Sequence, residues 1–343
     1  MLNHNIDVVI PFHVINNFLL ASINSVKASQ KVIVRVIAVN DTGQNIAKKD
    51  IQLEAEDTLI TNFGKGYLDA MATGISQIKS KFVGFQDSDD FTDPYRFFNQ
   101  LKYLQDHNLD LVTGQIIKVD SMGRSTKNKS IFGVLPSSLT PKQRLIFGSH
   151  GADSTIVAKS ILVKTTWHIH KSFPQNLADY GWLLTILPNI NIGHCREGVY
   201  YYRSHGTQMS RKTSGEQSWD KLRQLWIQNF ISAIKDINYD ATEIEKTLEN
   251  YSKVSLAIAF PSTLPVLDKC ERTILGNVIT LLTKNLNFEG SKDNEALRIL
   301  LFRRGFFATR GRSMSYLSQV FPIFHDFVLL FLKRIHPRFN IRI

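Results

Sequence analysis

The first third of the sequence alternates between short apolar runs and longer amphipathic segments, and this alternation restricts the fold more than any other feature. The apolar runs are typical of strands buried on both faces: Ile6–Ile10, Val32–Val39, Thr58–Thr61 and Phe82–Gln86. Between them Asn16 is placed as a helix N-cap, and Tyr67–Ile78 and Tyr95–Gln105 have helical periodicity. Strands that alternate with helices predict βαβ units and a Rossmann-like, mostly parallel central sheet with flanking helices.

The remainder of the chain changes character. Leu109–Val119 is predicted to be a longer strand that ends at the turn Ser121–Gly123, and Val199–Arg203 to be another strand. From Glu216 onward helical periodicity dominates. We therefore expect an α/β domain over residues 1–214 and a mainly helical region over residues 215–343.

Positive charge is concentrated at the end of the sequence. The chain has 41 Lys and Arg against 30 Asp and Glu, a net charge of +11, and residues 298–343 contain nine basic residues and one acid, Asp326. The same segment holds the apolar stretch Phe321–Leu332, which at about 1.5 Å per residue is too short to span a bilayer. This combination predicts a basic amphipathic tail on an anionic membrane surface. The alternative is a solvated basic face on a helix packed against the rest of the chain or a second subunit.

Several functional classes are disfavoured. Two cysteines are too few for a disulfide framework, and the first residues lack the features of an export signal, so a cytoplasmic protein is expected. Nucleic acid is not an expected partner, because the charge excess lies in the tail and carboxylates gather at the strand ends. Gly64-Lys65-Gly66 is not a dinucleotide fingerprint, since Asp69 stands where the third glycine belongs.

The most specific local signal is Asp87-Ser88-Asp89-Asp90 after an apolar run. Three carboxylates within four residues repel one another, and their burial is tolerable only where positive charge neutralises them. A hard divalent cation that also binds phosphate oxygens would supply that charge. The alternative is a solvated turn in which Asp90 caps the following helix.

These segments together resemble a known family. The series Asp7–His13, Val39–Gly43 and Phe85–Asp90, followed by Pro94 and Arg96, is similar in order and spacing to the N-terminal half of family 2 glycosyltransferases. The resemblance covers roughly residues 6–210 and implies the GT-A fold. It implies an inverting, metal-dependent transferase of the hexosyltransferase type, which moves a sugar from a nucleotide-diphosphate donor to a hydroxyl of an acceptor, and the expected donor is a UDP-sugar.

The resemblance also implies roles for residues around the donor. Pro11 and His13 match the step that contacts the nucleotide base, and Asp41 matches the acid that accepts a hydrogen bond from uracil. Asn40 stands where the family has a first acid, and turn formation alone is the alternative for this segment. Lys65 lies where the family approaches phosphate, with a solvated loop lysine as the alternative, and Ser88 falls within the acidic motif.

The acidic motif and the segment Tyr202–His205 supply the implied metal site. Asp87 and Asp89 match the Asp-x-Asp motif that holds Mn²⁺ or Mg²⁺ against the donor diphosphate, with Asp89 as ligand and Asp87 on ribose or metal-bound water. Arg203 would meet phosphate and His205 metal or diphosphate, with Arg211 and Lys212 on a neighbouring loop.

The acceptor side is implied by a segment farther along the chain. Leu177–Leu184 matches the family's acidic pair, with Asp179 as the catalytic base and Ala178 in place of the usual Glu. Two alternatives stay open: Asp179 only caps its helix, or Asp153, next to Gly148, His150, Gly151 and Ala152, is the base. The expected acceptor is a glycan or lipid-linked molecule in surface polysaccharide or glycolipid synthesis, at the inner face of the plasma membrane. A catalytically inactive, glycosyltransferase-like sugar-binding module is the alternative function.

Overall fold

The computed structural model describes residues 5–125, 153–173, 178–206, 220–235 and 241–251, with eight further positions between 254 and 278. Several sequence-based expectations lie outside these residues: the cluster at 148–152, Arg211 and Lys212, and the whole basic tail, residues 298–343. The chain forms two units, one of residues 1–135 and 139–225 and the other of residues 136–138 and 226–343. The first unit contains every described candidate residue.

The first unit is built on one sheet of eight strands, in the order β3-β2-β1-β4-β7-β6-β8-β5. The strands are β1 (Asn5–Phe12), β2 (Ile33–Asn40), β3 (Thr58–Thr61), β4 (Phe82–Phe85), β5 (Phe91–Thr92), β6 (Leu111–Val119), β7 (Ile156–Lys159) and β8 (Ile192–Arg203). β1, β2, β3 and β4 form parallel pairs and β6 is parallel to β8, whereas β7 is antiparallel to β4 and β6, and β5 to β8. The α/β prediction is confirmed, with a mixed sheet.

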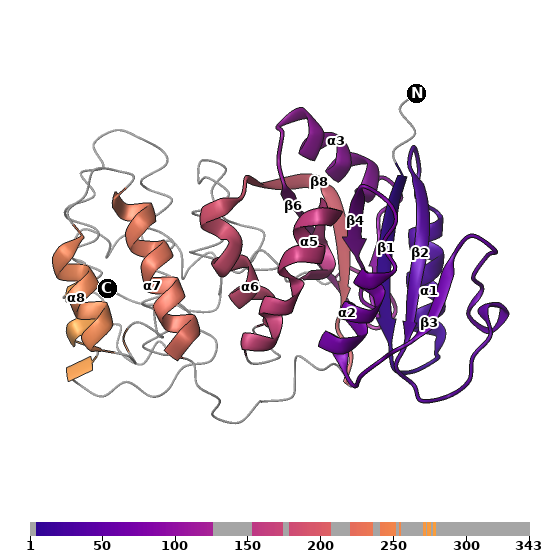
Figure 1. The fold of residues 1–343 in the computed structure, drawn as a ribbon, viewed down its shortest axis with the longest axis horizontal. Helices are drawn as coiled ribbons and strands as arrows, with labels where there is room; N and C mark the ends of the chain where they lie inside the picture. Colours follow the sequence, from indigo (N-terminus) through magenta and orange to yellow (C-terminus); the bar gives the residue numbers. More distant parts are fainter. Residues whose placement is uncertain are drawn as a thin grey trace, which may run out of the picture. The chain divides into compact units, whose positions relative to one another are not determined.

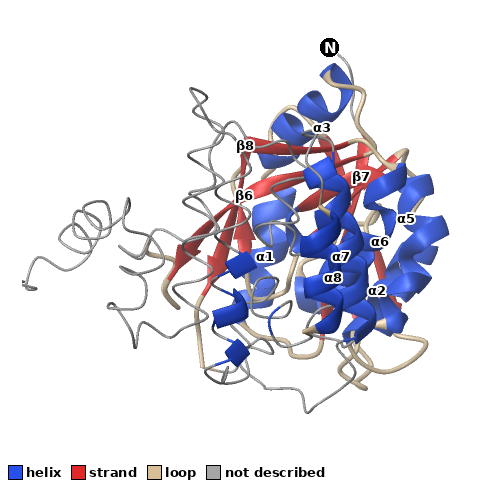
Figure 2. Cartoon of the chain, turned by 90° about the vertical axis from the view of Figure 1, so that its left-hand side faces the viewer, coloured by secondary structure: helices blue, strands red, loops and turns tan. Residues whose placement is uncertain are grey.

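Helices cover both faces of this sheet. They are α1 (Asn17–Lys27), α2 (Tyr67–Ser76), α3 (Arg96–Asp106), α5 (Ser160–Thr166) and α6 (Ala178–Ile186), joined by the 3₁₀ segments η1 (Lys48–Ile51), η3 (Asp153–Thr155), η4 (Trp167–Ser172) and η6 (Leu187–Asn189). Figure 1 shows how they surround the strands, and Figure 2 shows α2, α5 and α6 grouped on one side of the sheet.

The strand pattern explains the two faces. Alternate residues of a strand point to opposite sides, so Val8 and Ile10 of β1 join the buried cluster formed with α1 and α3. Val9 points to the other face, toward Gly74 of α2. Asn16 caps α1 as predicted, because its Oδ1 accepts hydrogen bonds from the N–H groups of Phe18 and Leu19, both at 3.0 Å.

Two elements differ from the sequence-based prediction. β8 begins at Ile192 instead of Val199, because the strand continues through a β-bulge whose exposed Arg196 and Glu197 interrupt the apolar pattern. The two-residue strand β5 is too short to produce any periodic signal. The turn after β6 is present, with the Gly123 N–H bonded to the Asp120 carbonyl at 2.9 Å.

The helical region is described only in part. α7 (Asp220–Lys235) crosses the division between the two units, and α8 (Thr242–Asn250) lies within the second. Trp226 and Phe230 of α7 stack with ring centroids 4.7 Å apart, and Ile244 and Leu248 of α8 are buried. In the described part of the chain, no helix combines the length and the apolar character needed to cross a bilayer.

Candidate active site

The sheet topology brings the candidate residues to one edge. β1, β2, β3 and β4 run in the same direction, so their carboxyl ends lie at one edge of the sheet. Since β7 is antiparallel to β4 and β6, and β8 is parallel to β6, the end of β8 and the start of β7 reach this edge as well. The edge is where open α/β sheets bind ligands.

The first two strands place three predicted donor-binding residues at this edge. Pro11 is buried near the end of β1, and His13 follows the strand with an exposed side chain. Asp41 follows β2, and its carboxylate accepts hydrogen bonds from Asn62 Nδ2 at 2.7 Å and from the Gly66 N–H at 3.0 Å. The Asp41 carboxylate is therefore fixed in position by the loop between β3 and α2.

Asn40, which replaces the family's first acid, closes its own turn. Its Oδ1 accepts from the N–H and hydroxyl of Thr42 at 2.9 and 2.7 Å, and its Nδ2 donates to the Gln44 carbonyl at 2.8 Å. Lys65 is exposed on the next loop, where its N–H donates to Asp69 Oδ2 at 3.1 Å. Asp69 also pairs with Lys171 of η4 at 2.7 Å, which links α2 to η4.

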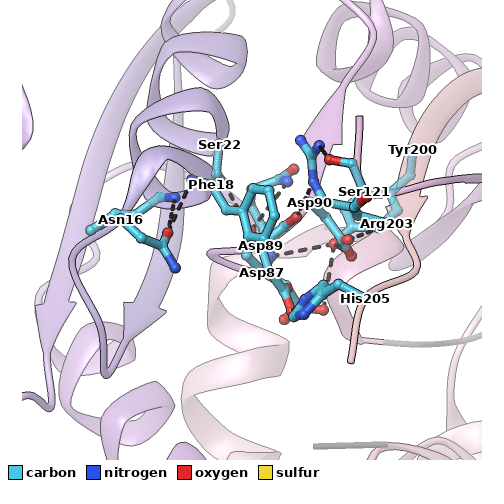
Figure 3. A network of polar contacts seen from close by, with 12 residues as sticks. Asn16, Phe18, Ser22, Asp87, Asp89, Asp90, Ser121, Tyr200, Arg203 and His205 are labelled. Atoms are coloured by element: carbon cyan, nitrogen blue, oxygen red, sulfur yellow. Dashed lines mark hydrogen bonds and ion pairs between the residues drawn. The ribbon is translucent and has the colours of Figure 1, made fainter. Parts of the chain in front are cut away.

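The acidic turn after β4 directs its carboxylates to different partners (Figure 3). Asp89 Oδ2 lies 2.8 Å from His205 Nε2. Asp90 is fully buried and accepts hydrogen bonds from the Tyr200 hydroxyl and the Arg203 N–H, both at 2.6 Å. Asp90 does not cap α3, so that alternative is wrong; Asp93 Oδ1 instead accepts from the Tyr95 N–H at 2.9 Å near the helix start.

Asp87 opens the turn, and both it and Ser88 beside it are half-buried. The Ser22 hydroxyl of α1 donates to the Asp87 carbonyl at 2.8 Å, and the Tyr200 hydroxyl lies 3.4 Å from Asp87 Oδ2. Burial, and next the charge of Asp89, raise the pKa of Asp87 to about 7. Burial in the same cluster raises the pKa of Asp90 well above its usual range. The two carboxylates thus lie where added positive charge is strongly favourable.

Arg96 supplies part of that charge from inside the domain. Its guanidinium is fully buried and donates to Gln100 Oε1 at 2.9 Å, Gln86 Oε1 at 3.0 Å and the Ser154 carbonyl at 2.5 Å. It also lies 4.9 Å from the centre of the Tyr200 ring. Burial lowers the pKa of Arg96 to about 10, so it stays charged at neutral pH.

Arg203 is the last residue of β8, and His205 lies two residues further along the chain. Arg203 is 6% exposed, and its guanidinium donates to the carbonyls of Asp89 and Ser121, both at 2.8 Å, between the rings of Phe18 and Phe91. In this arrangement Arg203 holds the acidic turn in place, and its contact with donor phosphate stays a prediction. His205 packs against Phe18, with ring centroids 5.2 Å apart, and faces Asp89.

The acceptor-side candidate Asp179 lies in the first turn of α6. Its Oδ1 accepts from the Tyr180 N–H at 2.8 Å, a local contact of the kind found at helix starts. Burial, and next the charge of Asp153, raise the pKa of Asp179 well above its usual range. The structure therefore brings both candidate bases, Asp179 and Asp153, into the same electrostatic neighbourhood.

Four further residues of this site were missed from sequence: Tyr67, Tyr200, Asn62 and His170. Burial, and next the charges of Asp87, Asp153 and Asp179, raise the pKa of Tyr67 well above its usual range. Tyr200 lies on β8, and its hydroxyl donates to Asp90 of the acidic turn. None of the four lies in a local motif, and only the pairing of distant strands brings them to the site.

Comparison with known proteins identifies the domain. A model of the glycosyl transferase family 2 matches residues 7–168. This match confirms the resemblance found in the motifs of this part of the chain. A search of the curated proteins finds no significant match.

Solved structures confirm the fold class. S. aureus TarS 1–349 in complex with UDP-GlcNAc is 16% identical, and the similarity covers 88% of this chain and 92% of that one with a TM-score of 0.54. The complex of the same protein with UDP is also 16% identical, with 89% and 88% covered and a TM-score of 0.50. At this identity the likeness shows the GT-A fold.

Proposed function

We propose that the chain is an inverting glycosyltransferase that moves a sugar from a UDP-sugar to a hydroxyl of an acceptor. The observation that carries this proposal is the convergence of two groups at one sheet edge: Asp87, Asp89 and His205 on one side, and Asp179 with Asp153 on the other. A group-transfer enzyme needs one set of residues for the leaving diphosphate and another for the incoming nucleophile.

The strand ends beside this edge form the donor site in our proposal. Pro11 and the exposed His13 would contact the base, and the fixed Asp41 carboxylate would accept the imino N–H of uracil. Lys65 and Arg203 carry the charges proposed for the diphosphate, and Ser88 lies within the acidic turn. The complexes of the TarS structures with UDP-GlcNAc and UDP support a uridine nucleotide as the donor.

A divalent cation fits the acidic turn. Asp89 Oδ2 and His205 Nε2 already face each other at 2.8 Å, and carboxylate and imidazole are ligands suited to Mn²⁺, with Mg²⁺ as the alternative. Among the described residues no three acidic, His or Cys side chains gather as a complete metal site, so diphosphate oxygens would complete the coordination. Asp87 would assist Asp89 and His205. The bound cation would stabilise the negative charge that develops on the diphosphate.

Asp179 is proposed as the base. It would accept the proton of the acceptor hydroxyl while the acceptor oxygen bonds to the anomeric carbon, and the bond from that carbon to the diphosphate oxygen breaks. Inversion follows from attack on the face opposite the leaving UDP. A raised pKa makes the Asp179 carboxylate a stronger base than an ordinary aspartate.

The acceptor and the location are proposed from the sequence. The basic, apolar character of residues 298–343 supports a peripheral position on the inner, anionic face of the plasma membrane. At that surface the enzyme would meet a lipid-linked or glycan acceptor in polysaccharide or glycolipid synthesis.

The experiment that tests the proposal measures UDP release from a panel of UDP-, GDP- and dTDP-sugars, with Mn²⁺ or with EDTA. We expect turnover of a UDP-sugar that requires the cation. Asp89→Asn should abolish this turnover, whereas Asp179→Asn should lower it roughly 10²–10⁴-fold and leave UDP affinity nearly unchanged, because Asp179 acts on the nucleophile.

An exposed acid away from the edge provides the control: Asp106→Asn should retain wild-type turnover. Absence of turnover with every donor, combined with sugar binding, would instead identify an inactive sugar-binding module. Wild-type turnover in Asp179→Asn would refute the assignment of the base.

A further inference from the structure

A buried acid and a buried histidine contact each other near the proposed base. Asp153 of η3 is 4% exposed and His170 of η4 is fully buried, and Asp153 Oδ2 lies 3.3 Å from His170 Nε2. Within the described part of the chain, neither Asp153 Oδ1 nor His170 Nε2 makes a hydrogen bond. These two buried polar atoms therefore lie at the contact between the two side chains.

Aromatic rings enclose the histidine. The imidazole of His170 stacks on Trp167 with ring centroids 3.6 Å apart and on Trp182 with centroids 4.8 Å apart. His170 Nδ1 lies 3.0 Å from the Trp167 carbonyl, which fixes the ring orientation. Both ring nitrogens face oxygen atoms, Nδ1 the Trp167 carbonyl and Nε2 the Asp153 carboxyl group.

This enclosure connects the pair to the base. Trp182 and Asp179 lie three residues apart on α6 and so share one side of the helix. The Trp182 indole N–H donates to the Thr166 hydroxyl at 3.0 Å, which fixes the ring that stacks on His170. The start of α6, with Asp179, is thus anchored through Trp182 and His170 to Asp153.

The sheet places Asp153 beside the acidic turn. β7 is antiparallel to β4, with Gly84 opposite Val157, and continuing this register brings η3 alongside the turn after β4. The ionisable groups that face Asp179 are Asp153 from η3, Asp87 from the turn after β4, and Tyr67 from α2. Asp153 therefore lies close enough to interact electrostatically with both Asp87 and Asp179.

A purely structural role explains this arrangement poorly. A buried ion pair is weak evidence for stability, because apolar residues of similar size often stabilise a core as well or better. Asp153 also keeps one oxygen without a hydrogen bond inside the protein, which is unfavourable. Buried polar groups retained despite such a cost need another explanation, and proximity to Asp179 provides one.

We propose that Asp153 and His170 form a positioning pair for Asp179: His170 holds the Asp153 side chain in place beside the base, and the stacked tryptophans fix α6 so that Asp179 meets the acceptor hydroxyl. The proposal rests on the function proposed above. It assigns no contact with substrate to either residue, and it makes Asp153 a supporting group instead of the base.

The test uses the full chain and compares Asp153→Asn, His170→Phe and the double variant with wild type. His170→Phe keeps a stacking ring and removes the nitrogens. His168→Phe is the matched control, because His168 is exposed on the same segment η4. Asp179 is followed by carboxyl ¹³C NMR titration, with its resonance assigned from Asp179→Asn, and kcat and KM for UDP release from UDP-GlcNAc are measured against pH.

We expect Asp153→Asn to lower the pKa of Asp179, because a negative charge beside it is removed. The acid limb of the kcat profile should move to lower pH by the same amount, and kcat should fall about tenfold or more because the base is weaker. UDP affinity should be unchanged. His170→Phe should shift the Asp179 titration and lower kcat with UDP affinity unchanged, because the contact that holds Asp153 in place is lost. The double variant should be no worse than the single ones, since the pair acts as a unit.

Three results would overturn the proposal. An Asp179 titration that is the same in all variants would show that the pair does not act on it. A fall in melting temperature without a shifted titration would leave a structural role only. Loss of kcat in Asp153→Asn to the level of Asp179→Asn would make Asp153 the base. The titration requires no turnover, so a wild type that releases no UDP would contradict the proposed function and still leave the pair testable.

Discussion

At the scale of single residues, the site combines buried acids with few compensating cations. Asp90 and Asp87 share the Tyr200 hydroxyl. The fully buried guanidinium of Arg96 lies over the ring of the same tyrosine. Each acid has a raised pKa because burial disfavours its charged form. Buried acids of this kind indicate a site for a positively charged ligand, because the cationic groups of the domain do not fully neutralise them.

The raised pKa of Asp87 should make the stability of the domain depend on pH. Its pKa rises from an ordinary 3.8 to about 7 in the folded domain, so the folded state holds a proton that the unfolded chain has lost between these values. The contribution of Asp87 to stability is therefore complete below about pH 4 and is lost as pH rises through 7. In EDTA, the melting temperature of wild type should fall over this range by a few degrees more than that of Asp87→Asn. Parallel pH curves for the two proteins would contradict the assignment.

At the scale of elements, the packing of α2 on the sheet sets the position of the loop that carries Lys65 and of Tyr67. A Cβ atom on Gly74 would lie 2.4 Å from Val9 Cγ1 and 2.9 Å from Val39 Cγ2, so the helix approaches the strands as closely as a glycine permits. The direct contact explains why α2 can hold Asp41 through the Gly66 N–H.

Gly74→Ala should displace α2 and lower the free energy of unfolding by about 1–3 kcal/mol, despite the better helix propensity of alanine. Urea denaturation provides the measurement. Gly206→Ala is the control, because a Cβ atom there lies within 4 Å of no atom in the described part of the chain, and its change should stay within about 0.5 kcal/mol. Equal stability of the two variants would show that the helix adjusts freely.

At the scale of the whole molecule, the net positive charge is concentrated in the tail: residues 1–297 together carry +3, and residues 298–343 carry +8. Residues 298–343 contribute eight of the eleven net positive charges. Polybasic segments bind anionic lipids with roughly 1 kcal/mol per basic residue near the surface. The tail is thus the part of the sequence best suited to bring the transferase to a lipid-linked acceptor.

Replacing four arginines of the tail by glutamine in the full chain should weaken binding to phosphatidylserine-containing vesicles on the order of a hundredfold or more. UDP release should be unchanged. The variant carries Arg303→Gln, Arg304→Gln, Arg310→Gln and Arg312→Gln, and the charge-matched control carries Lys49→Gln, Lys79→Gln, Lys102→Gln and Arg124→Gln on exposed positions of the domain. Vesicle sedimentation measures both, and equal binding by the two variants would contradict the role of the tail.

Local sequence patterns were sufficient to predict the parallel half of the sheet, the capped start of α1 and the resemblance to family 2 glycosyltransferases. Each of these depends on patterns within a few neighbouring residues, such as an apolar run, an N-cap or an acidic turn after a strand. Such local patterns also placed Asp41, Asp87 and Asp89 at strand ends. Parallel strands with a common direction then carry these ends to one edge without further information.

The partners that hold the buried acids, and the residues that support them, became visible in the tertiary structure alone. The antiparallel insertion of β7 sets Asp153 near Asp87, and β8 brings Tyr200 to a buried Asp90, although more than 60 residues of sequence separate each pair. Stacking between η4 and α6 then encloses His170. Pairing between distant strands, and the burial that raises these pKa values, depend on the whole packed domain and leave no periodic signal in the sequence.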